Sequence, residues 1–376
     1  MTAPEHWYCR AEAREWRAAP VTSTVEFHRS SPGYAPTPLT EVPDLARELG
    51  IARVFIKDES GRMSMPSFKI LGAAYAVARA VSEFLGEADR ALPIDELRKR
   101  LEVAARPTLV AATDGNHGRA VAHMAGILDL SARIFVPEST TRDAIRAIES
   151  EGAEVTELAL EYDEVVAHAR RVADELGDRG IHVQDTAWPG YEKIPGWIVD
   201  GYLTLFEEID AQLLEREVER LDLLAVPVGV GSLILAALRH YRVEGAVHRP
   251  SVLSVEADRA PSILASLYAG DAVSIHTSPT IMAGLNCGTP SASAWPDLRD
   301  GLDAAIAVSD PATAQAVHDL ENLGVDAGPC GASTLAGIRA AKPHFESLGL
   351  GPDSVVVLLS TESRSANPLP AEYQRS

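Results

Sequence analysis

Lysine is scarce in this chain of 376 residues, whose 34 basic residues include only five lysines. These are Lys57, Lys69, Lys99, Lys193 and Lys342. A reaction that needs a lysine amine therefore has few candidates. Basic residues are also outnumbered by 54 acidic ones, and the formal net charge is −20. Because a field of that sign repels nucleic acids and anionic membranes, we expect neither as a partner.

Cysteine pairs, metal-binding patterns and long apolar runs are missing as well. The three cysteines include no CxxC pair, and the 11 histidines show no spacing suited to metal ligation. The longest apolar stretch, Leu221–Leu238, is interrupted by polar residues, proline and glycine, and is unsuited to spanning a bilayer. The start, Met1–Arg17, has no apolar signal region. We expect a soluble, cytoplasmic protein without a disulfide scaffold or metal site.

Short apolar runs alternate with longer runs of helical period, which predicts an α/β fold with largely parallel sheets. The runs predicted as strands are continuous, as in sheets covered on both faces. They span residues 53–57, 108–112, 132–136, 154–158, 182–184, 223–228, 251–256, 304–308 and 354–359. Helices are predicted near 68–85, 117–129, 140–150, 161–177, 195–216, 232–243, 311–323 and 332–346. We interpret Gly86–Pro107 as a surface insertion and Gly270–Pro296 as a functional loop.

Lys69 has a setting that suits a reactive amine. In Pro66-Ser67-Phe68-Lys69, Ser67 is a plausible N-cap, which places Lys69 in the first helical turn. The helix dipole and apolar neighbours both lower an amine's tendency to stay protonated, as a Schiff-base lysine requires. The alternative is a solvated surface lysine, which is what we expect of the other four.

Three further motifs follow predicted strands. Thr113-Asp114-Gly115-Asn116-His117-Gly118 lies between a strand and a helix, where open α/β folds bind ligands. Gly229-Val230-Gly231-Ser232 is a loop that suits an anion, although it is neither a Walker A loop nor a full GxGxxG. Ser360-Thr361 ends the last strand and offers hydroxyls to a ring nitrogen. The respective alternatives are a tight turn, an ordinary strand–helix turn and a strand-end cap.

In this order, the motifs resemble the pyridoxal-phosphate enzymes of the tryptophan synthase β family, fold type II. Within it, the chain is most similar to the diaminopropionate ammonia-lyases. The segments behind that narrower resemblance are Phe27–Ser30, Pro36–Leu39, Lys57–Ser60, Thr113–Arg119, Gln184–Trp188, Gly229–Ser232 and Met282–Gly288. The resemblance implies a homodimer of two-domain subunits with mostly parallel, three-layer sheets. The large cofactor-binding domain would comprise residues 1–66 with 190–376, and the smaller, mobile domain residues 67–189.

The resemblance also implies a role for each motif. Lys69 would hold pyridoxal 5'-phosphate as a Schiff base and later move protons. Asn116 would meet the 3-oxygen of the pyridine ring, and Ser360 or Thr361 its nitrogen. A neutral hydroxyl there favours elimination. The phosphate would be held by the amides of Gly229, Val230 and Gly231 and by Ser232.

Asp114 is the residue that points to a diamine substrate. Relatives that dehydrate serine or threonine have a small neutral residue at this position. A carboxylate there could attract the substrate's second amine, or act as a base opposite Lys69 and so admit both enantiomers. Asp185 is a second candidate for binding that amine, with a strand-end cap as the alternative. The carboxylate pocket would be lined by Thr113, Gly115 and His117, of which His117 could instead be a packing residue.

The implied reaction is elimination of 2,3-diaminopropionate, D, L or both, to pyruvate and ammonia by a carbon–nitrogen lyase. Some segments depart from the lyase pattern. Asp326–Ser333 stands where a Ser-Gly-Glu-Ser segment is expected, and Ser363-Arg364 where glycine and aspartate are expected. A dehydratase or another β-elimination or β-replacement enzyme of this fold therefore stays an alternative. So does a non-catalytic amino-acid-binding module on the same scaffold.

Overall fold

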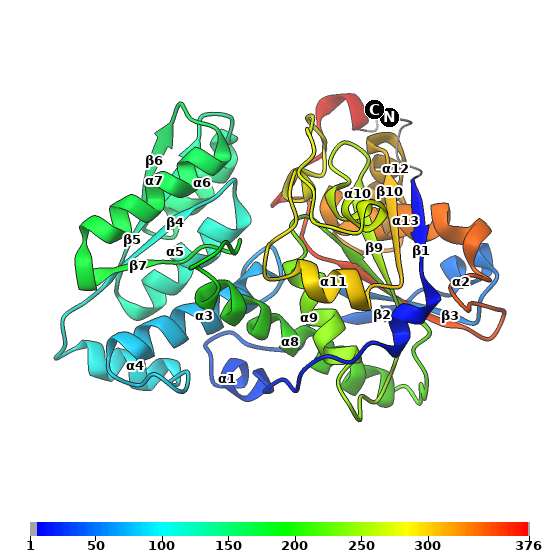
Figure 1. Cartoon of the computed structure of the whole chain (residues 1–376), viewed down its shortest axis with the longest axis horizontal. Coiled ribbons are helices and arrows are strands. Elements are labelled where there is room, and N and C mark those ends of the chain that lie inside the picture. Colours follow the sequence, from blue (N-terminus) through cyan, green and yellow to red (C-terminus); the bar gives the residue numbers. More distant parts are fainter. Residues whose placement is uncertain (1–5, 375–376) are drawn as a thin grey trace. The chain divides into compact units, whose positions relative to one another are not determined.

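A computed structural model describes residues 6–374, and the contacts within the chain divide it into two compact units. The first unit comprises Met1–Thr22, Pro36–Gly61 and Leu205–Ser376. The second comprises Ser23–Ala35 and Arg62–Thr204. Each unit has its own sheet with its own helices (Figure 1), so the two-unit α/β organisation predicted from the sequence is present.

The unit boundaries differ from those placed on the sequence. The expected boundaries follow residues 66 and 189, whereas the contacts place them after Gly61 and Thr204 and assign residues 23–35 to the second unit. Local packing is the reason. His28, on helix α1 (Val25–Arg29), lies with Nδ1 2.7 Å from Thr204 Oγ1 and Nε2 3.0 Å from the Leu71 carbonyl. Mobility of the smaller unit stays a prediction.

The first unit is built on a seven-stranded sheet in the order β1-β10-β9-β8-β11-β3-β2. The five central strands are parallel, and the two edge strands are antiparallel to their neighbours. The strands are β1 (Trp7–Cys9), β2 (Leu39–Glu41), β3 (Arg53–Asp58), β8 (Leu223–Pro227), β9 (Ser251–Ala257), β10 (Ala304–Val308) and β11 (Val355–Ser360). The edge strands β1 and β2 were not predicted, because three residues are too few to show a pattern.

Helices cover this sheet, whose central strands are buried along nearly their whole length. They are α2 (Pro43–Leu49), α9 (Ser232–Tyr241), α10 (Ser262–Ala269), α11 (Trp295–Gly301), α12 (Asp310–Asn322) and α13 (Pro329–Ala341). Ala332, Leu335 and Ile338 of α13 pack in one apolar cluster with Val255 and Leu358 of the sheet. Continuous apolar strands thus arise because both faces of the sheet are covered.

The second unit has a four-stranded, all-parallel sheet in the order β6-β5-β4-β7. Its strands are β4 (Thr108–Ala112), β5 (Ser131–Pro137), β6 (Glu154–Leu158) and β7 (Gly180–His182). Its helices are α1, α3 (Lys69–Phe84), α4 (Ile94–Leu101), α5 (Asn116–Leu128), α6 (Arg142–Ser150) and α7 (Tyr162–Glu175). Helix α8 (Lys193–Leu214) contains the boundary at Thr204.

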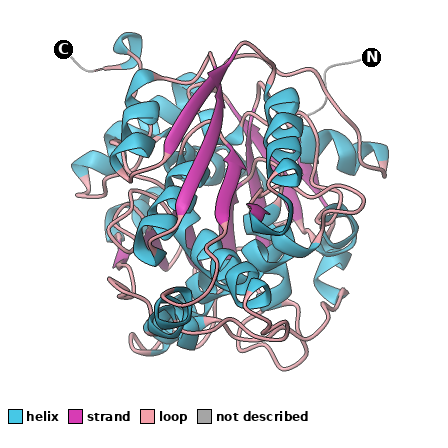
Figure 2. Ribbon diagram, turned by 90° about the vertical axis from the view of Figure 1, so that its left-hand side faces the viewer, coloured by secondary structure: helices cyan, strands magenta, loops and turns pink. Residues whose placement is uncertain are grey.

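Alternation along β4 sends its side chains to two covered faces. Val110 and Ala112 pack with Val165 and Ala169 of α7, so the residues between them point to the opposite face. That face is covered by α5. Figure 2 shows helices on both sides of the strands. The carboxyl ends of β4 and β7 lie side by side because the two strands are parallel neighbours.

Two segments expected at the surface carry buried residues. Gly86–Pro107, expected as a surface insertion, is mostly exposed or half-buried, but it contains helix α4, whose Ile94, Leu97 and Leu101 are buried. Lys57, expected to be solvated, is fully buried: its Nζ lies 2.6 Å from Glu208 Oε2 and 2.9 Å from the Thr37 carbonyl. A buried lysine needs such partners. Within residues 6–374, no helix combines the length and apolarity needed to cross a membrane.

Candidate active site

Lys69 is the first residue of helix α3, as the sequence predicted for the first turn. The predicted cap is wrong, however: Phe68 occupies the N-cap position with helical backbone angles, and no side chain caps the helix. Lys69 Nζ lies 2.7 Å from Asp185 Oδ2. The structure therefore joins two residues that the sequence separately selected, 116 positions apart.

The ion pair decides the charge of the lysine. Burial lowers the pKa of Lys69, but Asp185, Tyr202 and Asp114 together outweigh burial, and the net shift of the pKa is upward. Burial raises the pKa of Asp185, but Lys69 and His117, with the hydrogen bonds that the carboxylate accepts, together outweigh burial, so that pKa is lowered. The expectation that the helix dipole and apolar neighbours lower the pKa of this amine is thus wrong for the free lysine. The effect of a helix dipole on the pKa of an amine is small compared with that of a carboxylate at hydrogen-bond distance.

The turn after β4 is shaped by Thr113. Its Oγ1 accepts hydrogen bonds from the backbone N–H of Gly115 at 2.9 Å and of Gly118 at 3.0 Å. Gly118 has no room for a side chain, because an added Cβ would lie 2.2 Å from Thr113 Cγ2. Helix α5 begins at Asn116. Thr113 therefore holds the turn together, whatever else it contacts.

Two further side chains of this turn lie in the electrostatic neighbourhood of Lys69. His117 places Nε2 2.8 Å from the Val183 carbonyl and Nδ1 3.9 Å from Asp185 Oδ2, so it connects the turn to the segment that carries Asp185. The surrounding protein partly desolvates Asp114 and raises its pKa, while Lys69 opposes that rise. Asp114 nevertheless remains exposed to solvent. The Asp114 carboxylate is therefore accessible from solvent.

The glycine-rich loop lies in the first unit, between β8 and α9. Gly231 has a φ of +102° and is the N-cap of α9, a conformation that suits glycine. A Cβ on Gly229 would lie 2.9 Å from both Cys287 Sγ and the Gly284 carbonyl oxygen. The glycines of the loop thus leave the backbone uncovered at the N-terminus of α9, where backbone N–H groups favour binding of an anion. Ser232 is the first residue of that helix.

Ser360 lies at the same edge of that sheet as the glycine loop. Strands β8 and β11 are parallel neighbours, so their carboxyl ends adjoin. Ser360 is 1% exposed, and among the described residues its hydroxyl has no hydrogen-bond partner. A Cβ on Gly331 would lie 2.9 Å from Ser360 Oγ, so the glycine leaves space beside that hydroxyl. Thr361, its neighbour, is also buried.

Comparison with known proteins decides the family. The model of the pyridoxal-phosphate-dependent enzymes matches residues 30–362. The diaminopropionate ammonia-lyase of Escherichia coli strain K12 is 36% identical over 352 residues, or 90% of this chain and 86% of that protein. The chain belongs to the pyridoxal-phosphate-dependent enzymes.

Solved structures of pyridoxal-phosphate enzymes match the fold over almost the whole chain. Diaminopropionate ammonia-lyase from E. coli in complex with D-serine gives a TM-score of 0.85 at 31% identity, covering 96% of this chain and 94% of that one. The same enzyme in complex with an aminoacrylate–PLP azomethine reaction intermediate gives 0.83 at 30% identity, covering 97% and 96%. These matches confirm the fold type predicted from the motifs.

The residues present fit pyridoxal phosphate, the cofactor of this family. The cofactor offers an aldehyde, a phosphate and a ring nitrogen, and it needs an amine, a set of N–H donors and a partner for the nitrogen. Lys69 has the amine, and the Gly229–Ser232 loop has bare amides at a helix N-terminus. The unpartnered hydroxyl of Ser360 is the telling observation, since a buried hydroxyl normally has a partner.

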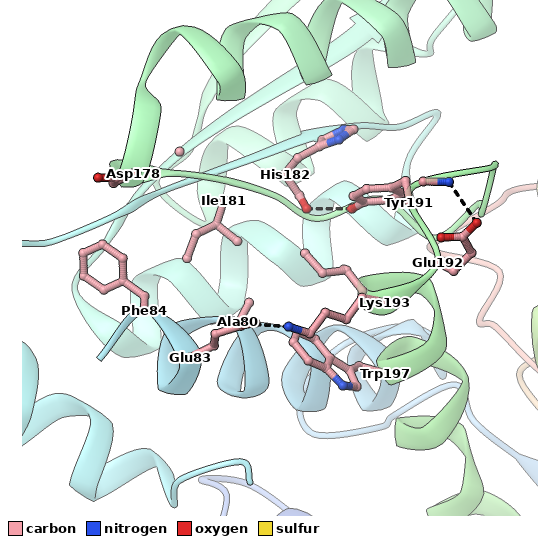
Figure 3. Close-up of a pocket in the computed structure, with 13 residues that line it drawn as sticks. Ala80, Glu83, Phe84, Asp178, Ile181, His182, Tyr191, Glu192, Lys193 and Trp197 are labelled. Atoms are coloured by element: carbon pink, nitrogen blue, oxygen red, sulfur yellow. Dashed lines mark hydrogen bonds and ion pairs between the residues drawn. The ribbon is translucent and has the colours of Figure 1, made fainter. Parts of the chain in front are cut away.

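A cavity of about 400 Å³ in the second unit contains none of the predicted site residues. It lies among the end of α3, the start of α8 and strand β7 (Figure 3). Tyr191 donates a hydrogen bond to the His182 carbonyl at its wall, and Lys193 pairs with Glu83. The aromatic ring of Trp197 and the side chain of Ile181 also line it. Nothing in its lining resembles a cofactor site.

Tyr202 is the residue that sequence reasoning missed. It lies in the middle of helix α8, its pKa is affected by both Lys69 and Asp185, and its hydroxyl is buried. No motif surrounds it, and it is 133 positions after Lys69 in the sequence. Only Gly72, a small residue one turn after Lys69, gives a local sign that a large group packs against α3.

Proposed function

We propose that this chain eliminates ammonia from 2,3-diaminopropionate, D, L or both, to give pyruvate. The observation that carries the proposal is the cluster in the second unit. Lys69 forms an ion pair with Asp185 at 2.7 Å, and a second carboxylate, Asp114, also raises the pKa of the lysine. The 36% identity to a diaminopropionate ammonia-lyase supports the substrate class. A relative that binds an aminoacrylate–PLP azomethine intermediate supports elimination as the reaction class.

The cofactor would be held by the residues that the sequence motifs predict. Lys69 would attach its aldehyde, and Asn116 would contact the 3-oxygen of the ring. The phosphate would be bound by Gly229, Val230, Gly231 and Ser232. Ser360 would donate to the ring nitrogen, with Thr361 as the other candidate. When bound, pyridoxal phosphate supplies an electron sink for the negative charge that develops at the α-carbon of an amino acid.

Asp185 would select a substrate with a second amine. Its carboxylate pairs with the free Lys69 ammonium at 2.7 Å. Once Lys69 is attached to the cofactor, Asp185 needs another cation, because a buried carboxylate without one is unfavourable. The 3-ammonium group of diaminopropionate meets that need, whereas the hydroxyl of serine does not. Thr113, Gly115 and His117 would line the place of the substrate carboxylate, with His117 in a supporting role.

Proton transfer would use the two groups that can reach the substrate from different elements. Lys69, from the start of α3, takes the α-proton of one enantiomer, and Asp114, from the turn after β4, takes that of the other. The leaving 3-amine receives a proton from Lys69 or Asp114. Overall, one diaminopropionate and one water give one pyruvate and two ammonia.

The deciding experiment is an assay of 2-oxoacid release from each enantiomer of diaminopropionate, with serine and threonine assayed separately as alternative substrates. We expect diaminopropionate to be preferred, and faster turnover of serine or threonine would refute the substrate. Lys69→Ala should abolish the visible absorbance of the bound cofactor. Asp114→Asn should lose activity on one enantiomer by about 100-fold or more. Full activity on both would refute the two-base proposal.

A different β-substituted amino acid is the second candidate substrate. The observation that favours it is the pair of departures near the end of β11. Arg364 forms ion pairs with Asp326 and Glu321, and Glu362 accepts from the Cys330 amide. The same assay, extended to other 3-substituted alanines, distinguishes the two. We further propose a cytoplasmic homodimer, which sedimentation of the purified protein and cell fractionation would test.

A further inference from the structure

The hydroxyl of Tyr202 is buried without a partner. The residue is 1% exposed, and within residues 6–374 its phenol oxygen makes no hydrogen bond. Burying a polar group without a partner is unfavourable, so such a group normally has a partner in the working state of the protein. We therefore look for a partner of the Tyr202 hydroxyl among nearby groups that are hydrogen-bonded to other residues in this structure.

The ring of Tyr202 packs against the first turn of helix α3. A Cβ on Gly72 would lie 2.6 Å from Cε1 and 2.8 Å from Cζ of the ring, and Cζ is the carbon that bears the hydroxyl. Gly72 lies three positions after Lys69 and therefore on the same side of the helix. The rings of Phe68 and Tyr202 are 4.8 Å apart, and Lys69 Nζ is 5.5 Å from the Phe68 ring. The phenol is thus fixed beside the start of α3.

The electrostatics place the hydroxyl in the same cluster. Burial raises the pKa of Tyr202 to about 12, while Lys69 lowers that pKa and Asp185 raises it. The phenol is therefore neutral at physiological pH. A neutral phenol oxygen accepts a hydrogen bond from an amine N–H.

We propose that Tyr202 is a positioning residue for Lys69, because its hydroxyl oxygen accepts a hydrogen bond from the lysine amine during proton transfer. A neutral amine has two N–H bonds and one lone pair. Asp185 accepts from one N–H at the position it holds in this structure, and a rotation of the lysine side chain brings the other to Tyr202. The lone pair is then left for the substrate proton. The inference rests on the proposed function only in requiring Lys69 to move a proton.

Tyr202→Phe is the direct test, since it removes the hydroxyl and keeps the ring that packs on Gly72. The first readout needs no amino acid: the rate at which cofactor-free protein takes up pyridoxal phosphate is followed by absorbance across pH. Uptake requires the neutral amine. We expect the profile to move to higher pH, because the neutral amine loses an acceptor while Asp185 still stabilises the ammonium form. With substrate, kcat should fall about tenfold with KM unchanged, as expected for one lost hydrogen bond.

The matched control is Tyr241→Phe, which removes a buried hydroxyl on α9 whose ring packs against Phe206 and His240. It should leave both readouts unchanged. Gly72→Ala is the second variant: its methyl group pushes the Tyr202 ring away while the hydroxyl remains, and it should reproduce the Tyr202→Phe profile. An uptake profile of Tyr202→Phe that matches the native one would overturn the proposal. Normal uptake without pyruvate release from diaminopropionate in the native protein would instead refute the proposed function.

Discussion

Lys69 Nζ and Asp185 Oδ2 lie 2.7 Å apart, so the lysine that we propose carries the cofactor is held as an ammonium by a carboxylate from the segment after strand β7. This ion pair fixes the position of the lysine side chain and makes its ammonium group harder to deprotonate. Asp185, together with Tyr202 and Asp114, stabilises the charged form of Lys69 more than burial destabilises it. The proposed attachment of the cofactor to Lys69 would therefore break this ion pair.

Asp185→Asn should lower the pKa of the Lys69 amine, because burial then acts without the opposing carboxylate. Reductive ¹³C-methylation followed by NMR titration measures it, and five lysines give few signals to resolve. The Lys69 signal is the one missing from Lys69→Arg. Asp174→Asn, in an exposed ion pair with Arg170, is the control and should change nothing. An unchanged Lys69 titration in Asp185→Asn would show that the pair has no influence.

Ser360→Ala should affect the cofactor more than the fold. The buried hydroxyl has no partner within the described part of the chain, so its removal should leave the free energy of unfolding of the cofactor-free protein unchanged or raise it by about 1 kcal/mol. Affinity for pyridoxal phosphate should weaken about tenfold, which equilibrium titration measures. Thr361→Val is the comparison. If it weakens affinity while Ser360→Ala does not, Thr361 is the partner of the ring nitrogen.

Gly118→Ala should destabilise the second unit. The added methyl would lie 2.2 Å from Thr113 Cγ2, so the turn must open and weaken two hydrogen bonds to Thr113 Oγ1. We expect a loss of about 1–3 kcal/mol in the free energy of unfolding, measured by urea denaturation. Gly126→Ala in the same helix is the control. Its methyl meets nothing closer than 3.4 Å, and it should stabilise by about 0.5–1 kcal/mol. Equal effects of the two changes would contradict the steric argument.

Sequence reasoning predicted the parts of the fold that repeat a local pattern. Strands β4, β6 and β10 have the predicted bounds, because covered strands are continuous apolar runs bounded by polar turns. Helix α4 escaped detection because a charged segment surrounds its three buried residues. Lys57 was misjudged because its partner, Glu208, lies 151 positions away, and no local pattern reveals such a pair.

In the candidate site too, residues in local sequence motifs could be predicted, whereas contacts that depend on tertiary packing could not. Lys69, Asp114 and Asp185 were found because each follows or begins an element in a recognisable motif. The ion pair between Lys69 and Asp185, and with it the raised pKa of Lys69, depends on how β4, β7 and α3 pack together. Tyr202 carries no motif at all. Its relation to Lys69 exists only through the close approach of α8 to Gly72.

His182 should make the protein less stable in mild acid. It ends strand β7 with 7% of its surface exposed, and neither ring nitrogen has a hydrogen-bond partner among residues 6–374. Burial, followed by the charges of His117 and Arg170, lowers the pKa of His182 from 6.5 to about 4. Between these two pH values, His182 therefore binds a proton in the unfolded chain but not in the folded chain. The resulting stability is complete above pH 6.5 and is lost as the pH falls from 6.5 towards 4, by about 3 kcal/mol in all.

His182→Phe removes this component while keeping an aromatic ring against Tyr191 and Trp188, whose centroids are 5.2 and 6.0 Å away. Urea unfolding of the native protein and of the variant at pH 7 and pH 4.5 measures it. On acidification, the native protein should lose more free energy of unfolding than the variant does, by up to about 3 kcal/mol. Substitution of the exposed His276 by Gln is the control and should show no such shift. A native-minus-variant difference that stays constant between the two pH values would mean that His182 takes up its proton in the folded state as readily as in the unfolded one.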